Sequence, residues 1–189
     1  HGLSDRKEFR KNLRQALDRG LTEDDALAAL TVIPARICGV EQSLGTLEAG
    51  RIANLTVVEG SYFDPASRVR AVWVDGMPYR TTEADGTNVT RTARDEGGPL
   101  PRLAKDPASQ RGPLATPPHM LINNATLWTC GPAGVLTNAQ LLVSGGRIQM
   151  VGDFRAKLPE DTVVIDGTGL HVTPGIVDCH SHSMVLGSV

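Results

Sequence analysis

The stretch that decides the fold lies near the end of the chain and reads Val172-Thr173-Pro174-Gly175-Ile176-Val177-Asp178-Cys179-His180-Ser181-His182. A Pro-Gly bend precedes a short apolar run, which we expect to begin a buried strand. Side chains two residues apart lie on one face of a strand, so His180 and His182 point the same way. Neutral imidazole is the commonest metal ligand, and Zn²⁺ readily binds two or three imidazoles. The stretch therefore predicts a metal site at these two histidines.

Length and composition exclude several classes of protein. The chain has 189 residues, 40% of them hydrophobic and 21% charged, with a net charge of −2. This is enough to bury a core, and it gives no basic face for nucleic acid or a membrane surface. No apolar run reaches the roughly 18 residues of a spanning helix. We expect a small-molecule substrate and neither a nucleic-acid nor a membrane partner.

The chain carries no targeting signal, and its compartment stays open between cytoplasmic and exported. It begins with His1 and stops shortly after the two histidines, so we expect an internal piece of a longer polypeptide. The three cysteines, Cys38, Cys130 and Cys179, are widely spaced and odd in number. This spacing argues against a disulfide scaffold and a zinc ribbon. Cys179 alternates away from the histidine face, so we do not count it as a ligand.

Helix signals dominate residues 1–40. Ser4 or Asp5 can cap a first helix that runs to Arg19, with Gly20 as its stop. Its apolar stripe is Phe9, Leu13, Ala16 and Leu17. Thr22 begins a second helix with acidic residues in its first turn, and Pro34 breaks that helix before a short one at 35–38. The buried side of the second helix is predicted to be Ala26, Leu27, Leu30 and Ile33.

Strand signals dominate two further regions. Residues 44–58 and 69–74 show β-rich runs, and Asp75-Gly76 predicts a hairpin that returns through 77–80. Residues 81–118 are rich in proline and glycine without periodicity, which predicts a mobile, protease-sensitive linker. Strands are expected again at 120–129, at 139–144 and 147–151 around Gly145-Gly146, and at 162–165.

The residues from Pro174 to His182 resemble the signature of the metal-dependent amidohydrolase superfamily, in particular imidazolonepropionase- and dihydroorotase-like enzymes. In that family the two histidines end the first strand of a TIM barrel and bind a catalytic metal. The resemblance implies that His180 and His182 bind a divalent metal, with Zn²⁺ expected. The resemblance assigns no catalytic role to any of the 189 residues of this chain.

Two more regions are similar to parts of the same family. Residues 20–40, 44–58 and 72–79 resemble the C-terminal end of an amidohydrolase, with Asn54 where Asp is more usual. Residues 121–127, 142–152 and 164–175 resemble its N-terminus. The order, an end followed by a beginning, implies the junction of two tandem amidohydrolase units.

The resemblance implies an α+β fragment built around a composite β-sandwich, the urease-like small domain of the family. Residues 1–40 would be the C-terminal helices of one TIM barrel, and 41–80 the sandwich strands that end the first unit. A linker follows at 81–118. Residues 119–173 would be the sandwich strands that begin the second unit, and 174–189 its first barrel strand, which carries the histidines.

The implied activity is hydrolysis of a C–N bond in a cyclic amide-like small molecule by metal-activated water. The other ligands and the proton-shuttling Asp of the second unit would lie beyond Val189. In the first unit that Asp either precedes the chain or is replaced by His1. His119 and His171 lack such context and are interpreted as structural or exposed. Two alternatives stay open: a non-catalytic β-scaffold that packs the units together, with a relic metal motif, and a simple metal-binding protein.

Overall fold

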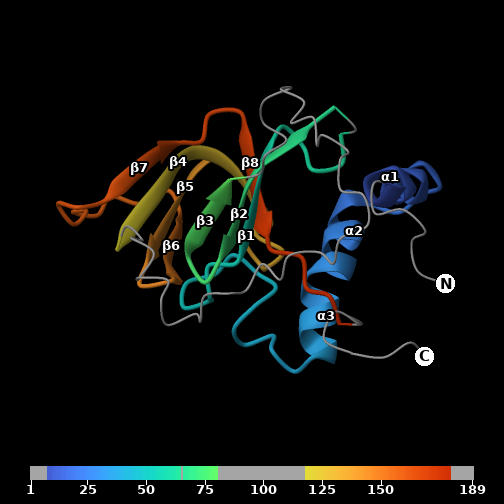
Figure 1. Cartoon of the computed structure of the whole chain (residues 1–189), viewed down its shortest axis with the longest axis horizontal. Helices are drawn as coiled ribbons and strands as arrows, with labels where there is room; N and C mark the ends of the chain where they lie inside the picture. Colours follow the sequence, from blue (N-terminus) through green and yellow to red (C-terminus); the bar gives the residue numbers. More distant parts are fainter. Residues whose placement is uncertain (1–7, 65, 81–117, 180–189) are drawn as a thin grey trace, which may run out of the picture.

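The computed structural model describes residues 8–64, 66–80 and 118–179 (Figure 1). We call the part up to Arg80 the first segment and the part from Pro118 the second segment. The linker expected at 81–118 therefore lies outside the described residues except for Pro118. The elements in chain order are α1 (Phe9–Asp18), α2 (Glu23–Leu30), α3 (Val32–Ile37), β1 (Leu55–Glu59), β2 (Arg68–Val74), β3 (Met77–Arg80), β4 (His119–Trp128), β5 (Val135–Ser144), β6 (Arg147–Gly152), β7 (Val163–Asp166) and β8 (Leu170–Pro174).

Both segments contribute strands to one mixed sheet of eight strands. Its order is β3-β2-β1-β8-β4-β5-β6, and β7 pairs with β4. The first segment supplies β1 to β3, and β1 pairs antiparallel with β8 of the second segment. Most neighbours are antiparallel, but β4 runs parallel to both β7 and β8. The pairing between the two segments, which the sequence allowed, is present, and the composite sandwich and the TIM barrel stay predictions.

The sheet curls until two hairpin turns from opposite ends of the strand order touch. A Cβ atom on Gly76, in the β2–β3 turn, would lie 2.5 Å from the Cα atom of Gly146, in the β5–β6 turn. Ala53 joins both turns: its N–H donates to Gly146 O at 2.9 Å, and its carbonyl accepts from Gly76 N at 3.0 Å. The predicted hairpins at 75–76 and 145–146 are confirmed, and together they close the curl.

The concave side of this curl holds the main hydrophobic core. Alternate positions on the strands point inward, as the period of two requires. The buried members from the first segment are Leu47, Ala53, Leu55, Val57 and Trp73. Those from the second are Met120, Ile122, Ala125, Leu127, Ala139, Leu141, Val143, Ile148 and Val172. We call this set the inner core. Neither segment supplies it alone.

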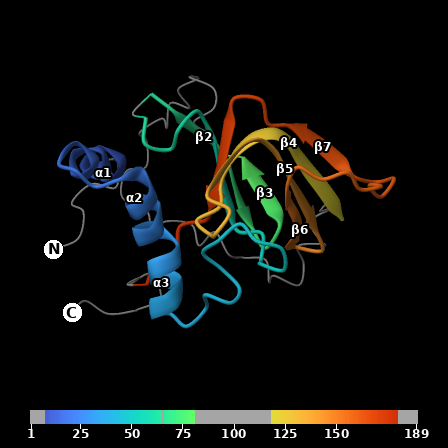
Figure 2. The same ribbon diagram turned by 180° about the vertical axis from the view of Figure 1, so that it is seen from behind.

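The three helices lie together at one end of the molecule, beside the sheet (Figure 1; Figure 2). Helix α1 ends as predicted, because Gly20 N donates to Leu17 O at 2.9 Å and Leu21 N to Ala16 O at 3.1 Å. Thr22 caps α2 as predicted, accepting a 3.1 Å hydrogen bond from Asp25 N. The proposed caps of α1, Ser4 and Asp5, lie outside the described residues.

The break between α2 and α3 differs from the prediction. Helix α2 ends at Leu30, and α3 already begins at Val32, so Pro34 lies inside the first turn of α3. A first-turn proline loses no intrahelical hydrogen bond, which is why the break moves ahead of it. The helix is interrupted at Thr31, whose φ of −131° and ψ of −76° are not helical, and Ile33 turns outward to 47% exposure instead of extending the buried side of α2.

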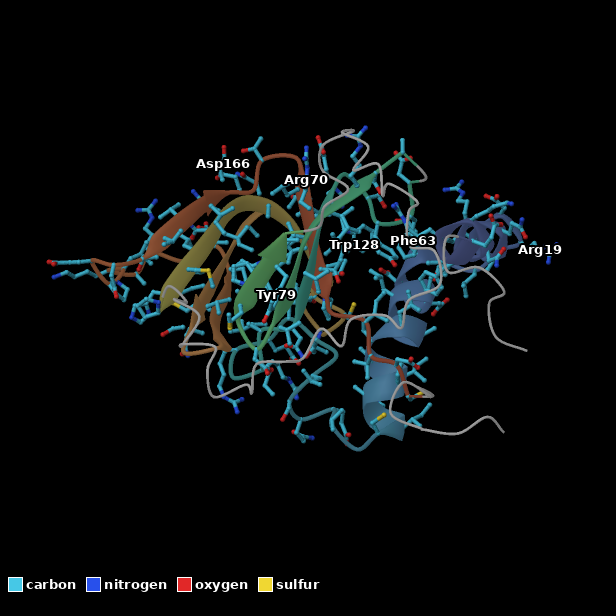
Figure 3. All side chains as sticks on the ribbon, viewed as in Figure 1. Arg19, Phe63, Arg70, Tyr79, Trp128 and Asp166 are labelled. Carbon is cyan, nitrogen blue, oxygen red and sulfur yellow. The ribbon has the colours of Figure 1, made fainter. Side chains whose placement is uncertain are left out.

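A second, smaller cluster joins the helices to the sheet, and we call it the helix-side cluster. Its buried members are Ala26, Leu27, Val58, Tyr62 and Phe63, and partly buried residues around it include Phe9, Leu13, Leu17 and Trp128. The apolar stripe predicted for α1 therefore faces the protein. Phe63 and Trp128 lie between the sheet and the helices (Figure 3).

Candidate metal-binding segment

Strand β8 carries the chain towards the predicted ligands. It lies between β1, where Leu55 is opposite Pro174 and Val57 opposite Val172, and β4, which it meets at residues 171 and 172. Val172 is fully buried and Pro174 is buried. A strand paired on both sides has little freedom, so the approach to the histidines is fixed by the sheet. The partner on one side comes from the first segment.

Gly175 follows directly and contacts the first segment again. Its N–H donates to Asn54 O at 2.7 Å. A Cβ atom at Gly175 would lie 3.2 Å from the Asn54 carbonyl carbon, closer than most side chains tolerate. Asn54 is itself held, because its Oδ1 accepts from Asp75 N at 2.7 Å. The Pro-Gly bend thus lies against the residue that stands where the family pattern more often has Asp.

Val177 makes the third contact with the first segment. Its N–H donates to Leu30 O at 2.9 Å. In a continuous helix that carbonyl would accept from the N–H of residue 34, four positions on. Residue 34 is proline and has no N–H. The proline therefore leaves a carbonyl available at the end of α2, and the chain that approaches His180 uses it.

The expected strand start at Ile176 and Val177 is wrong. Residues 175–178 are not in a strand, and Ile176 is 48% exposed. Strand β1 begins at Leu55, opposite Pro174, so no further partner residue continues the ladder. The chain leaves the sheet there and crosses to the helices.

The predicted ligands His180 and His182 lie outside the described residues. Within the described residues, no group of three or more His, Cys, Asp or Glu side chains could hold a metal ion. Cys179 is an exposed, free thiol. The described residues alone therefore do not supply a coordination shell, and the role of His180 and His182 stays a prediction.

His171 and His119 take the structural roles that the sequence suggested. His171 Nδ1 accepts a 2.9 Å hydrogen bond from Trp128 Nε1, which fixes its neutral tautomer. Burial lowers the pKa of His171, and the charge of Glu23 opposes that shift. His119 lies 3.9 Å from Asp161, with its side chain 27% exposed. Neither histidine belongs to a group of three or more possible metal ligands among the described residues.

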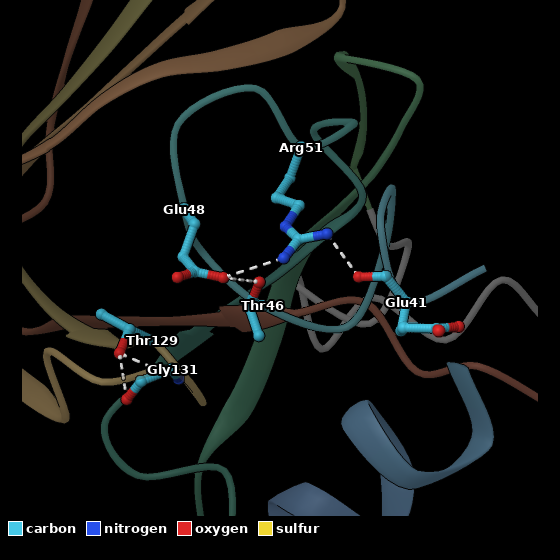
Figure 4. Close-up of polar contacts among 6 residues, drawn as sticks. All are labelled: Glu41, Thr46, Glu48, Arg51, Thr129 and Gly131. Carbon is cyan, nitrogen blue, oxygen red and sulfur yellow. Dashed lines mark hydrogen bonds and ion pairs between the residues drawn. The ribbon is translucent and has the colours of Figure 1, made fainter. Parts of the chain in front are cut away.

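A polar cluster that the sequence motifs did not predict lies between the two segments. Glu48 accepts from Thr46 Oγ1 at 2.7 Å and from Arg51 Nη2 at 3.1 Å, and Arg51 also donates to the Glu41 carbonyl (Figure 4). The Thr46 hydroxyl is the main cause that lowers the pKa of Glu48; desolvation opposes it and Arg51 adds to it. These residues lie within the glycine-punctuated run 44–58, whose charged positions were the available signal.

The same cluster packs against the loop after β4. Leu47 N donates to Thr129 O at 2.8 Å, and a Cβ atom on Gly131 would lie 3.3 Å from the Glu48 carboxyl carbon. Thr129 Oγ1 accepts from Gly131 N at 3.2 Å and so shapes that loop (Figure 4). The Glu48 carboxylate of this cluster is paired with the Arg51 guanidinium. Its chemistry fits a structural joint, not acid–base catalysis.

A cleft of about 280 Å³ lies between α2 and the loop after β4, lined by Asp24, Asp25, Trp128 and Cys130 among others. Burial raises the pKa of Cys130, so its thiol stays protonated near neutral pH. A protonated, half-buried thiol is a poor nucleophile and a poor metal ligand. We therefore assign no chemistry to this cleft.

No helix in the described ranges is long and apolar enough to cross a membrane.

Comparison with known proteins gives one family and several relatives. Residues 5–86 match the Amidohydrolase family. The chain is 38% identical over 68 residues to imidazolonepropionase of Idiomarina loihiensis, covering 35% of this chain and 17% of that protein. It is 39% identical over 66 residues to adenine deaminase of Clostridium botulinum, covering 35% and 11%.

A third relative is 5-methylthioadenosine/S-adenosylhomocysteine deaminase of Pelotomaculum thermopropionicum, 39% identical over 69 residues and covering 34% of this chain and 16% of that protein. No solved structure gives a significant match. The chain spans between 11% and 17% of the length of these three relatives. The family resemblance predicted from the sequence is confirmed.

Proposed function

Because residues 5–86 of this chain belong to the amidohydrolase family, we propose that the complete protein is a metal-dependent hydrolase that cleaves a carbon–nitrogen bond. The chemistry expected of the metal, a divalent ion such as Zn²⁺, is the activation of water for attack. The part that this chain plays is to deliver His180 and His182. Strand β8, Gly175 and Val177 fix the path of the chain up to Val177.

One observation carries the proposal beyond the family match. Two stretches that resemble family patterns, around Asn54-Leu55 and around Pro174-Gly175, lie far apart in the sequence and meet in the structure. This contact supports a family-like small domain in which the histidine stretch is held at a defined place. The division into two tandem units, with this chain as their junction, is part of the proposal.

The names of the relatives support a proposal for the substrate class. Their names refer to an imidazolone, an adenine and two adenosine derivatives, all of which contain a nitrogen heterocycle. We propose a small nitrogen heterocycle, with a cyclic amide-like bond as the first candidate. The 189 residues by themselves are expected to hydrolyse nothing, because two imidazoles do not complete a metal site with an open position.

The test uses the complete protein with the first unit's metal site disabled. His180→Ala and His182→Ala should each lose most of the bound zinc and most of the hydrolysis of a panel of cyclic amides and aminopurines. His119→Ala is the matched control, because it removes an imidazole with no expected ligand role. Unchanged zinc content and turnover in both motif variants would show that the pair is structural.

The second candidate is a non-catalytic β-scaffold that packs two units together. The observation in its favour is that the described residues of both segments form a shared core. Among these residues there is no group of three or more side chains that could hold a metal ion. The sequence beyond Val189 separates the two functions. A metal-bridging Lys or Glu, two more histidines and a strand-end Asp support the enzyme, and their absence supports the scaffold.

A further inference from the structure

The strongest unexplained feature of the molecule is the number of places where the second segment is bound by the first. Strand β8 pairs with β1 over five residues, from Leu170 opposite Glu59 to Pro174 opposite Leu55. At one end of this ladder Gly60 N donates to Gly169 O at 3.0 Å, and at the other Gly175 N donates to Asn54 O at 2.7 Å. The ladder is therefore closed by a hydrogen bond at each end.

Beyond the ladder, the first segment offers one more acceptor that its own helix cannot use. Pro34 cannot donate to Leu30 O, and Val177 N occupies this carbonyl at 2.9 Å. A carbonyl left without a partner at a partly buried helix end costs free energy. We call β1, Asn54 and the Leu30 carbonyl the docking seat, and residues 170–177 its occupant.

A second contact area lies at the other side of the curl. Gly50 N donates to Ile148 O at 2.8 Å, and Ile148 N donates to Arg51 O at 2.9 Å. Arg147 Nη1 donates to Gly50 O at 2.8 Å. With the close approach of Gly76 to Gly146, these contacts hold the β5–β6 hairpin against the first segment.

We propose that the first segment binds the second as a docked partner through this seat, and that the two stay together when the polypeptide between them is cut. Three properties lead to this conclusion. The inner core takes residues from both segments, so separation exposes it on both. The backbone contacts lie at several separate places. The Leu30 carbonyl is made available by proline, independently of the occupant.

The contribution of the connection can be compared with that of the interface. A covalent connection between bound modules contributes an effective concentration in the millimolar range. An interface with a dissociation constant of about 1 μM or lower therefore survives loss of the connection at a protein concentration of about 10 μM. Obligate interfaces resemble a domain core cut in half, and the inner core divided between the two segments has this character, so we expect a dissociation constant of this order.

The experiment places a specific protease site between Gly97 and Gly98 of the full chain, which is then cut after folding. The two pieces should elute together at about 10 μM and give one complex in native mass spectrometry. Hydrogen exchange at the Val172 and Val177 amides should stay as slow as in the uncut chain. Separate elution after prolonged incubation, or fast exchange at both amides, would overturn the proposal.

A pair of proline variants tests the seat itself. Val177→Pro removes the N–H that donates to Leu30, whereas Ile176→Pro removes an N–H for which the described residues show no hydrogen bond. Loss of one hydrogen bond should raise the dissociation constant of the cut pieces about fivefold in Val177→Pro. The Ile176→Pro control should remain within about twofold of the parent. Equal constants for the two variants would show that Leu30 is no part of the seat.

These measurements need neither metal nor substrate. If the pieces stay bound and the complete protein proves inactive, the proposed hydrolase function fails and the docking seat stands. If the pieces separate while the complete protein hydrolyses its substrate, the reverse holds.

Discussion

The inner core and the α1 side of the helix-side cluster differ in how completely their residues are enclosed. Leu55, Leu127 and Leu141 of the inner core are fully buried, and strands of both segments surround them. On the helix side, α1 contributes no fully buried residue. Its stripe covers the cluster from one side only. The two segments share their most enclosed region, the inner core, whereas α1 is attached to the helix-side cluster by one face.

The same comparison extends to polar contacts. Arg10 of α1 donates to the carbonyls of Tyr62, Asp64 and Ser67 and lies 5.4 Å from the centre of the Tyr62 ring. A guanidinium therefore supplies part of the attachment that apolar burial supplies in the inner core. Attachments of this kind open locally at lower free energy than enclosed cores.

The largest effect is expected from removing an enclosed leucine. Leu141→Ala in β5 should lower the free energy of unfolding by about 2–5 kcal/mol, because it leaves a cavity in a fully buried site. Leu13→Ala in α1 removes the same atoms from a partly buried site and should cost about 1 kcal/mol. Urea denaturation of both variants measures the difference. Equal costs would mean that the helix side is as tightly enclosed as the inner core.

The next effect concerns the turn where the curl closes. Gly145 and Gly146 both have positive φ, 56° and 76°, so alanine at either position carries a similar backbone strain of about 1 kcal/mol. Only at Gly146 would the new Cβ atom also meet a backbone atom, Asp75 O at 2.8 Å; at Gly145 nothing lies within 4 Å.

Gly146→Ala should therefore destabilise the protein by about 1–3 kcal/mol more than Gly145→Ala, since the two hairpins have to move apart. Thermal denaturation of the pair gives the difference directly. Hydrogen exchange at the Ala53 amide, which donates to Gly146 O, should accelerate only in the Gly146 variant. Indistinguishable stability and exchange would contradict the close contact.

Local signals in the sequence predicted most elements, because their causes are local. Gly20, Thr22 and the two hairpin turns act through hydrogen bonds within a few residues, and all are found where expected. Strand β5 was predicted too short, from residue 139. It begins at Val135, but Asn138 has a φ of 51°, which breaks the alternation that the pattern needs.

Contacts between distant residues could not be predicted in the same way. The partner of β1 could be anticipated only as a possibility, since the ladder depends on a match between residues more than a hundred positions apart. The hydrogen bond from Val177 N to the Leu30 carbonyl could not be predicted either, because Pro34 is the only residue in the sequence that indicates a carbonyl without a helical partner. The prediction that a strand continues after Pro174 was wrong. The sequence shows the apolar pair Ile176-Val177, but it does not show that the neighbouring strand β1 ends its pairing opposite Pro174. The metal ligands stay a prediction.

A smaller effect concerns the hydrogen bond between Trp128 and His171 at the helix side. The pKa of His171 is lowered, so the folded state favours the neutral imidazole. Its contribution to stability is complete above the ordinary pKa of about 6.5 and decreases as the pH falls below that value. His171→Gln should flatten this part of the stability profile, and the control His119→Gln should leave it unchanged. A profile that keeps its slope in His171→Gln would assign the effect to other groups.

The smallest effect concerns Glu48, at the joint between the first segment and the loop after β4. The Thr46 hydroxyl, and after it Arg51, lower the pKa of this carboxyl, with desolvation acting the other way. Stability from the ionised form is therefore present above the ordinary value of about 4.5 and is lost as the pH falls through the lower folded value. The side chain is 38% exposed, so solvent screens the interaction and the gain stays small.

Thr46→Val should move the Glu48 titration, followed by carboxyl NMR, back towards its ordinary range while the Leu47–Thr129 hydrogen bond persists. An unmoved titration would show that the hydroxyl does not set the charge of this joint, and that the inner core alone aligns the two segments there.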